Sequence, residues 1–228
     1  MITAPPYGGG VLSLLLQLPE MGKTLVVIRH SERPSFHNLP IEEWDKAQLT
    51  ANGIQAAKEF GGALARDATI DSLAIYSWGL KRCAETADAI ASGADRAGCE
   101  IIDRKEIGLK SPIADRGKYD AALRAGDYNR MLNDWLSPET KQTTMVPVDE
   151  YAPEIFGELL DSSTYSQHRT TVVVTHDLHV IPLARHVFGF PIPMPGYLDG
   201  LVAKANSKQV QIGYSGMHKS IERSQVVR

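Results

Sequence analysis

The sequence predicts an α/β fold in three layers, with a mostly parallel β-sheet between helices on both of its faces. Three runs, at residues 25–28, 73–77 and 171–175, are largely apolar and rich in β-branched residues. Such runs are typical of strands that are buried on both faces, as in parallel sheets. A helical pattern follows each run, and this alternation favours parallel strands joined by crossover helices.

The first of these helices is expected to begin after Thr50, whose hydroxyl can cap it. Its inward face should carry the residues at helical spacing, namely Ile54, Ala57, Phe60, Gly61 and Leu64. A second helix is expected over residues 80–91. A third should follow residue 177, where Ile181 and Val187 are among the apolar residues.

Further strands are expected at Ile101–Ile102 and in the C-terminal part of the chain. Residues 201–205 and 209–214 flank an Asn-Ser-Lys turn, which predicts a C-terminal hairpin at the edge of the sheet. The fold class is therefore α/β with a C-terminal edge hairpin.

The domain organisation follows from where the alternation of strands and helices is interrupted. We expect one domain over residues 21–228, with an insertion at about 108–169 that lies over the sheet and contains helices near 119–136 and 150–160. Residues 1–20 are interpreted as an N-terminal extension that packs on the surface or stays mobile. Its apolar run, 11–18, follows no basic residue, unlike a signal peptide, and is shorter than the about 20 residues of a membrane span.

Composition limits the kinds of partner that we expect the protein to bind. The chain has 228 residues, 43% of them hydrophobic, and a net charge of −3, which gives no reason to expect nucleic acid or a membrane as partner. Cys83 and Cys99 are too few for a disulfide framework. We expect two reduced, buried thiols, which fits a cytoplasmic protein.

Chemically active side chains follow three of the predicted strands. The segment 29–34 follows the first strand, Arg82 comes shortly after the second, and His176-Asp177 follow a later one. Ligands of open α/β sheets bind at the carboxyl ends of parallel strands. Two histidines, three arginines and an acid can therefore meet in one crevice, where guanidinium groups suit phosphate oxygens and a histidine can accept phosphorus.

These motifs resemble the histidine phosphatase superfamily, which includes phosphoglycerate mutases, acid phosphatases and phytases. The Arg-His-Ser-Glu-Arg-Pro segment at 29–34 resembles the Arg-His-Gly-x-Arg-x-Pro signature of the acid phosphatase branch, and His176-Asp177 resembles the His-Asp pair of that branch. Residues 49–56 and 77–87 look more like the smaller, phosphoglycerate mutase-like branch. The resemblance implies a phosphoglycerate mutase-like fold.

The resemblance also implies roles. His30 would be the nucleophile that forms a phosphohistidine, which water then hydrolyses. His176 would be part of the pocket that binds the substrate phosphate. The groups that would bind the substrate phosphate are Arg29, Arg33, Arg82 and Ser31, the last in place of the usual glycine of the family. Because a cationic cradle can neutralise the phosphoryl charge, we expect no metal and no other cofactor.

Two acids compete for the role of proton donor. Asp177 would protonate the leaving oxygen as in a His-Asp pair, although it can also cap the helix that follows. Glu106 stands near the position where the mutase-like branch keeps its catalytic glutamate. Arg82 can likewise pair with Glu85 on its own helix instead of binding phosphate.

The expected activity is hydrolysis of a phosphomonoester, carried by a small molecule or a protein. The alternatives are a mutase-like phosphotransferase and a non-catalytic relative that binds a phosphorylated ligand. A metal-dependent His-Asp hydrolase is disfavoured because its pair would not follow a strand. Basic residues of the insertion, Lys110, Arg116, Lys118 and Arg124, either meet further negative charge on the substrate or face solvent.

Overall fold

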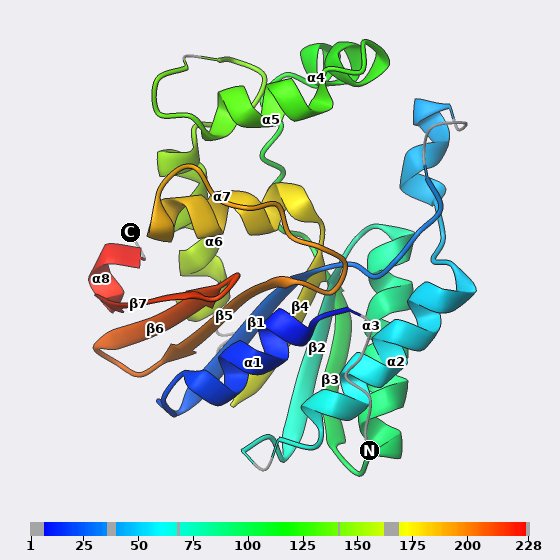
Figure 1. Ribbon diagram of the computed structural model, residues 1–228, viewed down its shortest axis with the longest axis vertical. Helices are drawn as coiled ribbons and strands as arrows, with labels where there is room; N and C mark the ends of the chain where they lie inside the picture. The colour runs from blue at the N-terminus through cyan, green and yellow to red at the C-terminus, as the bar shows by residue number, and fades with distance from the viewer. Residues whose placement is uncertain (1–6, 36–39, 68, 141, 162–168, 227–228) are drawn as a thin grey trace.

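The sheet has seven strands in the order β3-β2-β4-β1-β5-β6-β7 in a computed structural model that describes residues 7–35, 40–67, 69–140, 142–161 and 169–226 (Figure 1). The strands are β1 (Lys23–Arg29), β2 (Ser72–Trp78), β3 (Glu100–Ile107), β4 (Thr170–Thr175), β5 (Gly200–Ala205), β6 (Gln209–Tyr214) and β7 (Met217–Glu222). Strands β3, β2, β4 and β1 are parallel, whereas β5, β6 and β7 pair antiparallel. The α/β class is confirmed.

Helices cover both faces of this sheet. Their bounds are α1 (Gly9–Gln17), η1 (Ile41–Lys46, a 3-10 helix), α2 (Ala51–Leu64), α3 (Lys81–Arg96), α4 (Arg116–Arg124), α5 (Tyr128–Leu136), α6 (Val148–Asp161), α7 (Asp177–Phe188) and α8 (Arg223–Val226). Alternate residues of β1 divide between two cores: Val26 and Ile28 pack with α1, α2 and α3, while Leu25 and Val27 pack with α5, α6 and α7. The three layers follow from this alternation.

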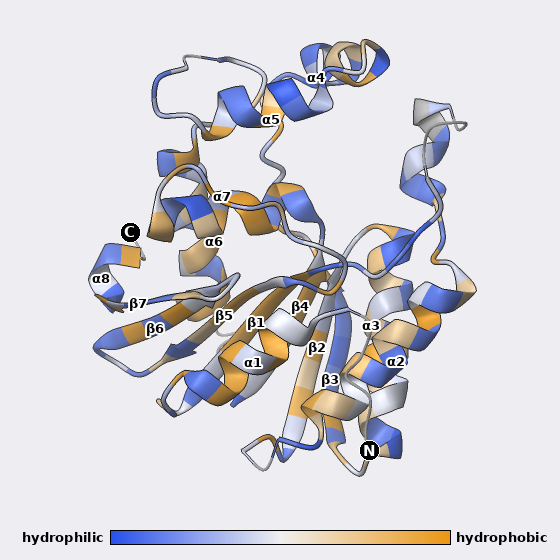
Figure 2. Ribbon diagram, in the orientation of Figure 1, coloured by the Kyte–Doolittle hydropathy of each residue, from blue (hydrophilic) through white to orange (hydrophobic). Residues whose placement is uncertain are grey.

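The two edge strands of the sheet, β3 and β7, differ from the sequence prediction. Strand β3 is longer than the predicted Ile101–Ile102, and its mostly polar residues appear blue beside the orange central strands in Figure 2. The predicted hairpin forms β5 and β6, but β7 pairs beyond it and is the edge strand. Both β3 and β7 are largely exposed, so neither carries the apolar pattern of a buried strand.

Helix α2 begins as predicted and packs closely on α3. The Thr50 hydroxyl accepts a hydrogen bond from the Gly53 amide. A Cβ at Gly61 would lie 2.0 Å from the carbonyl oxygen of Ile90 in α3, so only glycine allows this approach. Ile54 was wrongly expected to face inward: it is 37% exposed, about two turns before the close contact at Gly61.

Residues 108–169 do not form one layer over the sheet. Helix α6 packs on α7, and its Tyr151, Ile155 and Phe156 are fully buried in the core of the sheet. Helices α4 and α5 instead lie beyond the carboxyl ends of the parallel strands (Figure 1). The helices expected near 119–136 are α4 and α5, which are separated at Gly126, whose φ of 76° favours glycine.

The expected N-terminal extension supplies α1, which lies against β5 and β6 with Val11, Leu14 and Leu15 buried. Both cysteines are free and buried, as predicted. Within the described ranges, no helix is long and apolar enough to cross a membrane.

Candidate active site

The parallel register brings the predicted motifs together at the carboxyl ends of β1, β2 and β4. Arg29 of β1 pairs with Thr175 of β4, and Ser77 of β2 pairs with Val174. The His30 amide donates to the Thr175 carbonyl over 2.7 Å, which places His30 beside His176 at the strand ends. Helices α3 and α7 both begin at these strand ends, so their partially positive amino ends add to the charge there.

His30 is 2% exposed, and its protonation state can be read from its contacts. The Nδ1 atom lies 2.8 Å from the Ser31 carbonyl oxygen, which can only accept, so Nδ1 carries the proton. Burial and the neighbouring Arg82 lower its pKa well below the usual value. His30 is therefore neutral at pH 7, and Nε2 keeps the lone pair that a nucleophile needs.

Arg82 holds this nitrogen from the start of α3. Its Nε donates to His30 Nε2 over 3.1 Å, and its Nη1 donates to the Trp44 carbonyl over 2.9 Å. Glu85 instead accepts from the Leu49 amide, so the alternative pairing of Arg82 with Glu85 is not formed. At 7% exposure, Arg82 is a buried cation directed at Nε2 of His30.

Arg29 lies on the other side of His30. Its Nη1 donates to the Pro195 carbonyl, its Nη2 lies 3.9 Å from the Asp177 carboxylate, and its guanidinium stacks on the Tyr197 ring at 4.9 Å. The buried Nε of Arg29 has no hydrogen-bond partner within the described residues. Such a donor is costly to bury, and a ligand oxygen can satisfy it.

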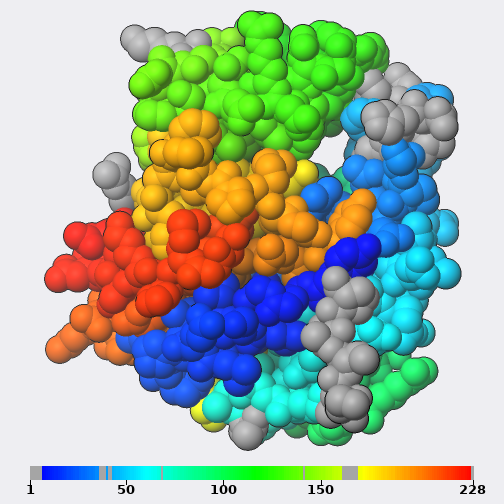
Figure 3. Space-filling model, in the orientation of Figure 1, coloured from blue at the N-terminus to red at the C-terminus, as the bar shows by residue number. Residues whose placement is uncertain are grey.

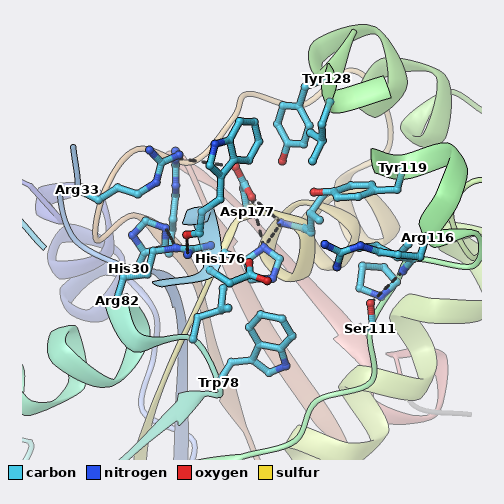
Figure 4. A pocket seen from close by; sticks show the side chains of 18 of the residues that line it. His30, Arg33, Trp78, Arg82, Ser111, Arg116, Tyr119, Tyr128, His176 and Asp177 are labelled. Atoms are coloured by element: carbon cyan, nitrogen blue, oxygen red, sulfur yellow. Dashed lines mark hydrogen bonds and ion pairs between the residues drawn. The ribbon is translucent and has the colours of Figure 1, made fainter. Parts of the chain in front are cut away.

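Arg33 also lines the cleft, with one guanidinium nitrogen donating to the Pro34 carbonyl over 2.8 Å. Burial, opposed by Tyr197 and reinforced by Arg82 and Arg29, lowers its pKa to about 10. The side chain remains charged at neutral pH, so Arg29, Arg33 and Arg82 all bring positive charge to the cleft that His30 lines. Figure 4 shows Arg33 and Arg82 near His30.

His176 caps α7 beside the same site. Its Nδ1 lies 3.3 Å from the Leu178 amide nitrogen and 3.5 Å from Oδ1 of Asp177. Burial lowers its pKa, although Asp177 opposes the change. The ring packs 4.7 Å from Trp78, which fixes its orientation.

Asp177 lines the cleft beside these cations. Its carboxylate also accepts from the Leu178 amide over 3.0 Å, so it helps to cap α7 as well. Burial alone would raise its pKa, but His176, Arg29 and His30 outweigh burial and hold the pKa below its usual value. The carboxyl group is ionised in the empty site at neutral pH.

Ser31 does not take the place expected for a phosphate ligand. Its amide donates to the Thr86 hydroxyl over 3.0 Å, and its own hydroxyl donates to the Gly53 carbonyl over 2.7 Å. The residue is fully buried and does not line the cleft. Both of its donors are used inside the protein, so we correct the expected role to one of anchoring the motif to α2 and α3.

Glu106 is not brought to the site either. It lies near the carboxyl end of β3, paired with Ser77, and is exposed. Its carboxylate sits beside Gly79 and is absent from the cleft lining. The outermost parallel strand carries it away from His30, whereas Asp177 follows the central strand β4. Of the two candidate acids, only Asp177 faces the cleft.

The cleft has a volume of about 1060 Å³ and continues well beyond the cationic residues. In Figure 3 the surface is hollowed between the green insertion helices and the light-blue segment around η1. Its lining includes residues that the sequence did not single out for this site, namely Trp44, Tyr119, Tyr128 and Tyr197. No sequence motif marks them, because α4, α5 and η1 reach the cleft only through the tertiary fold.

The basic residues of the insertion divide between the cleft and the surface. Arg116 and Arg124 line the cleft, whereas Lys110 pairs with Glu154 and Lys118 pairs with Asp115. Among the described residues, no three His, Cys, Asp or Glu side chains form a group that could hold a metal ion.

A buried neutral histidine and three arginines meet at the carboxyl ends of the parallel strands, an arrangement suited to an anionic ligand. A sequence model of the histidine phosphatase superfamily (branch 1) matches residues 25–222. The chain therefore belongs to this superfamily. No curated protein matches it.

Solved structures with low sequence identity share the fold. Bacillus stearothermophilus YhfR is 17% identical with a TM-score of 0.55, over 88% of this chain and 96% of that one. A mycobacterial glucosyl-3-phosphoglycerate phosphatase in complex with VO3 is 16% identical (TM-score 0.54; 85% and 98% covered). A phosphoglycerate mutase from Bacillus anthracis is 17% identical (TM-score 0.54; 90% and 95% covered). The phosphoglycerate mutase-like fold is thus confirmed.

Proposed function

We propose that the protein is a phosphatase that hydrolyses a phosphomonoester through a phosphohistidine on His30, without a metal ion. The observation that carries this proposal is the fixed tautomer of His30. Its Nδ1 proton is held by the Ser31 carbonyl, so the Nε2 lone pair points to Arg82 inside the cationic cradle.

In the first step the phosphoryl group binds between the three arginines and His176. His30 Nε2 then forms a bond to phosphorus while the bond from phosphorus to the ester oxygen breaks. The arginines offset the charge on the phosphoryl oxygens throughout, which is the main requirement of such transfers.

Asp177 supplies the proton to the leaving oxygen. Its pKa is low in the empty site because Arg29 and His176 lie against it. A bound phosphoryl group pairs with the same cations and adds negative charge, and both effects raise the pKa of the carboxyl group. In the second step a water molecule gives a proton to Asp177, and its oxygen bonds to phosphorus while the bond from phosphorus to His30 Nε2 breaks. Inorganic phosphate then leaves.

Acid-quench of the enzyme mixed with a ³²P-labelled ester tests the covalent step. An acid-labile, base-stable phosphoprotein should appear in the native protein and be absent from His30→Ala, which should also lose turnover while keeping its circular dichroism spectrum. Full activity in His30→Ala would end the proposal. Product analysis with an added alcohol acceptor separates a hydrolase, which releases phosphate, from a phosphotransferase.

A further inference from the structure

The outer half of the cleft is built differently from the cationic end. Its lining includes Trp44 from η1 and Tyr119 and Tyr128 from the insertion, the apolar residues Leu80, Ile113 and Leu123, and the two arginines Arg116 and Arg124 of α4. A volume of about 1060 Å³ reaches the upper end of the about 300–1,000 Å³ usual for drug-sized ligands. A phosphate alone would leave most of this space empty.

The leaving group must occupy this outer half. The inner end is closed by the sheet, where His30 and His176 are buried. Tyr128 lines the cleft together with Asp177, the acid that we place at the leaving oxygen, and the negative charge of Asp177 helps to raise the pKa of the Tyr128 phenol. Burial raises the pKa of both Tyr119 and Tyr128, so both phenols stay neutral. The group attached to the ester oxygen therefore meets the neutral rings of Tyr119 and Tyr128, with the Arg116 guanidinium 5.8 Å from the Tyr119 ring (Figure 4).

We infer, on the basis of the phosphatase function above, that the substrate is a phosphomonoester whose alcohol carries an aromatic ring. The ring of the substrate packs against Tyr119 and Trp44, where offset or edge-on aromatic contacts add to burial of apolar surface. The arginines at the inner end bind the phosphoryl group and contribute equally for every ester.

The test compares 2-phenylethyl phosphate with butyl phosphate. The two alcohols have nearly equal basicity, so the chemistry of their departure is matched and only the ring differs. We expect kcat/KM to be about tenfold or more higher for the phenylethyl ester, the advantage of burying a side chain of this size. Tyr119→Ala and Trp44→Ala should lower this ratio toward one. The ratio does not depend on the fraction of folded protein, because both esters are measured in one preparation.

Three results would overturn the inference. They are a ratio near one in the native protein, a ratio unchanged in both variants, or equal rates for 2-cyclohexylethyl phosphate and the phenylethyl ester. No turnover of any ester would instead contradict the phosphatase function and remove the basis of this inference with it.

A second, independent observation concerns residues 7–20, which precede the part matched by the family. Lys204 of β5 is 2% exposed beneath α1. Its ammonium donates to the carbonyl oxygens of Leu15 and Leu18, over 2.8 and 3.1 Å, and to the Glu20 carboxylate. These acceptors take all three of its protons, so α1 is fixed to the sheet by a buried charge.

Tyr7, two residues before α1, contacts residues that adjoin the active site. The Tyr7 hydroxyl donates to the Glu32 carboxylate over 2.5 Å, and the Thr50 hydroxyl donates to the other oxygen over 2.7 Å. The Tyr7 ring packs edge-on against Tyr197 at 5.6 Å. Tyr197 in turn lies under the guanidinium of Arg29.

Tyr7 thus contacts two supports of the phosphate cradle. Glu32 lies between His30 and Arg33 in the chain, and Tyr197 stacks on Arg29. We propose that residues 7–20 are a positioning element of the active site, with Tyr7 as the positioning residue and α1 as its anchor. The segment holds the cationic cradle in the geometry that binds phosphate.

Calorimetric titration with inorganic phosphate tests this role without requiring turnover. Tyr7→Ala should weaken phosphate binding by about fivefold or more, and Tyr7→Phe by less, since it keeps the ring and loses a hydrogen bond to a charged group. The matched control is Tyr76→Phe, which removes a hydroxyl that donates to the Asp103 carboxylate over 2.8 Å outside the cleft. It should bind phosphate as the native protein does.

A merely structural role would lower Tm in Tyr7→Ala and leave phosphate affinity as it is. Native affinity in Tyr7→Ala, or equal weakening in Tyr76→Phe, would therefore overturn the proposal. Because binding is measured directly, a protein that binds phosphate normally but hydrolyses no ester would contradict the phosphatase function and leave this proposal standing.

Discussion

Arg82 donates a hydrogen bond from Nε to Nε2 of His30 over 3.1 Å, on the nitrogen that we propose as the nucleophile. The same guanidinium reaches the Trp44 carbonyl through Nη1. Arg82 therefore couples the reacting atom to the wall of the outer cleft. A bound phosphoryl group would take over this donor, because its oxygens compete with the imidazole lone pair for the same proton.

Arg82→Lys should lower kcat/KM by about 10²–10³-fold, because a lysine cannot hold His30 and Trp44 together with a planar fork. Steady-state kinetics with butyl phosphate checks this. The exposed neighbour gives the control: Lys81→Ala should stay close to native activity. Equal losses in the two variants would count against a specific role of Arg82.

Asp177→Asn should depress hydrolysis of butyl phosphate by about 10²–10⁴-fold, since its alkoxide needs a proton to leave. Hydrolysis of nitrophenyl phosphate, whose leaving group is stable as an anion, should fall far less. Glu106→Gln should show no such dependence, because Glu106 does not line the cleft. If the dependence appears in the Glu106 variant instead, the proton donor has been misassigned.

Ser31→Ala should lower stability and leave KM unchanged. The substitution leaves the buried Gly53 carbonyl without its hydroxyl partner, at a cost of about 1–3 kcal/mol. Urea unfolding and the KM for butyl phosphate measure the two effects separately. A raised KM at native stability would restore Ser31 as a phosphate ligand.

EDTA should leave the rate unchanged, and vanadate should inhibit in competition with substrate, because arginines provide the positive charge of the site. Activity assays before and after dialysis against the chelator check this. Loss of activity that a divalent ion restores would favour metal-dependent chemistry.

The free energy of unfolding should fall as the pH drops below about 6.5. Burial lowers the pKa of His30, His176 and His179 in the folded protein, so the unfolded chain binds more protons in this range. Each such group can contribute up to about 1.4 kcal/mol per pH unit. Asp177, whose folded pKa is also low, adds a further loss only below about pH 4. Urea unfolding between pH 7.5 and 5 should show the slope, and His179→Gln should reduce it.

The inner site could be predicted because it depends on strand order along the chain. Arg29, His30 and His176 directly follow buried strands, and parallel pairing brings such ends together wherever the helices lie. Arg82 follows for a similar reason, since α3 begins shortly after β2. The apolar runs that define these strands are strong signals even in a single sequence.

The placement of the other site residues depends on the direction in which each side chain points. Glu106 follows the expected spacing, but β3 is the outermost parallel strand and carries it away from His30. The hydroxyl of Ser31 turns toward α2, which no motif specifies. Tyr119 and Tyr128 reach the cleft only because α4 and α5 fold over the edge of the sheet, and their sequence resembles any polar helix surface.

The packing of Trp78 gives the protein an internal optical probe. Its indole lies 4.7 Å from the His176 ring and 5.0 Å from the His179 ring, and its Nε1 is fixed on the Leu109 carbonyl. Indole emission responds to the charge of an adjacent imidazole and to the polarity around it. Of the three tryptophans, Trp135 is buried away from the cleft, so its signal is a constant background. Occupancy of the phosphate cradle can therefore be followed by fluorescence in the unlabelled protein.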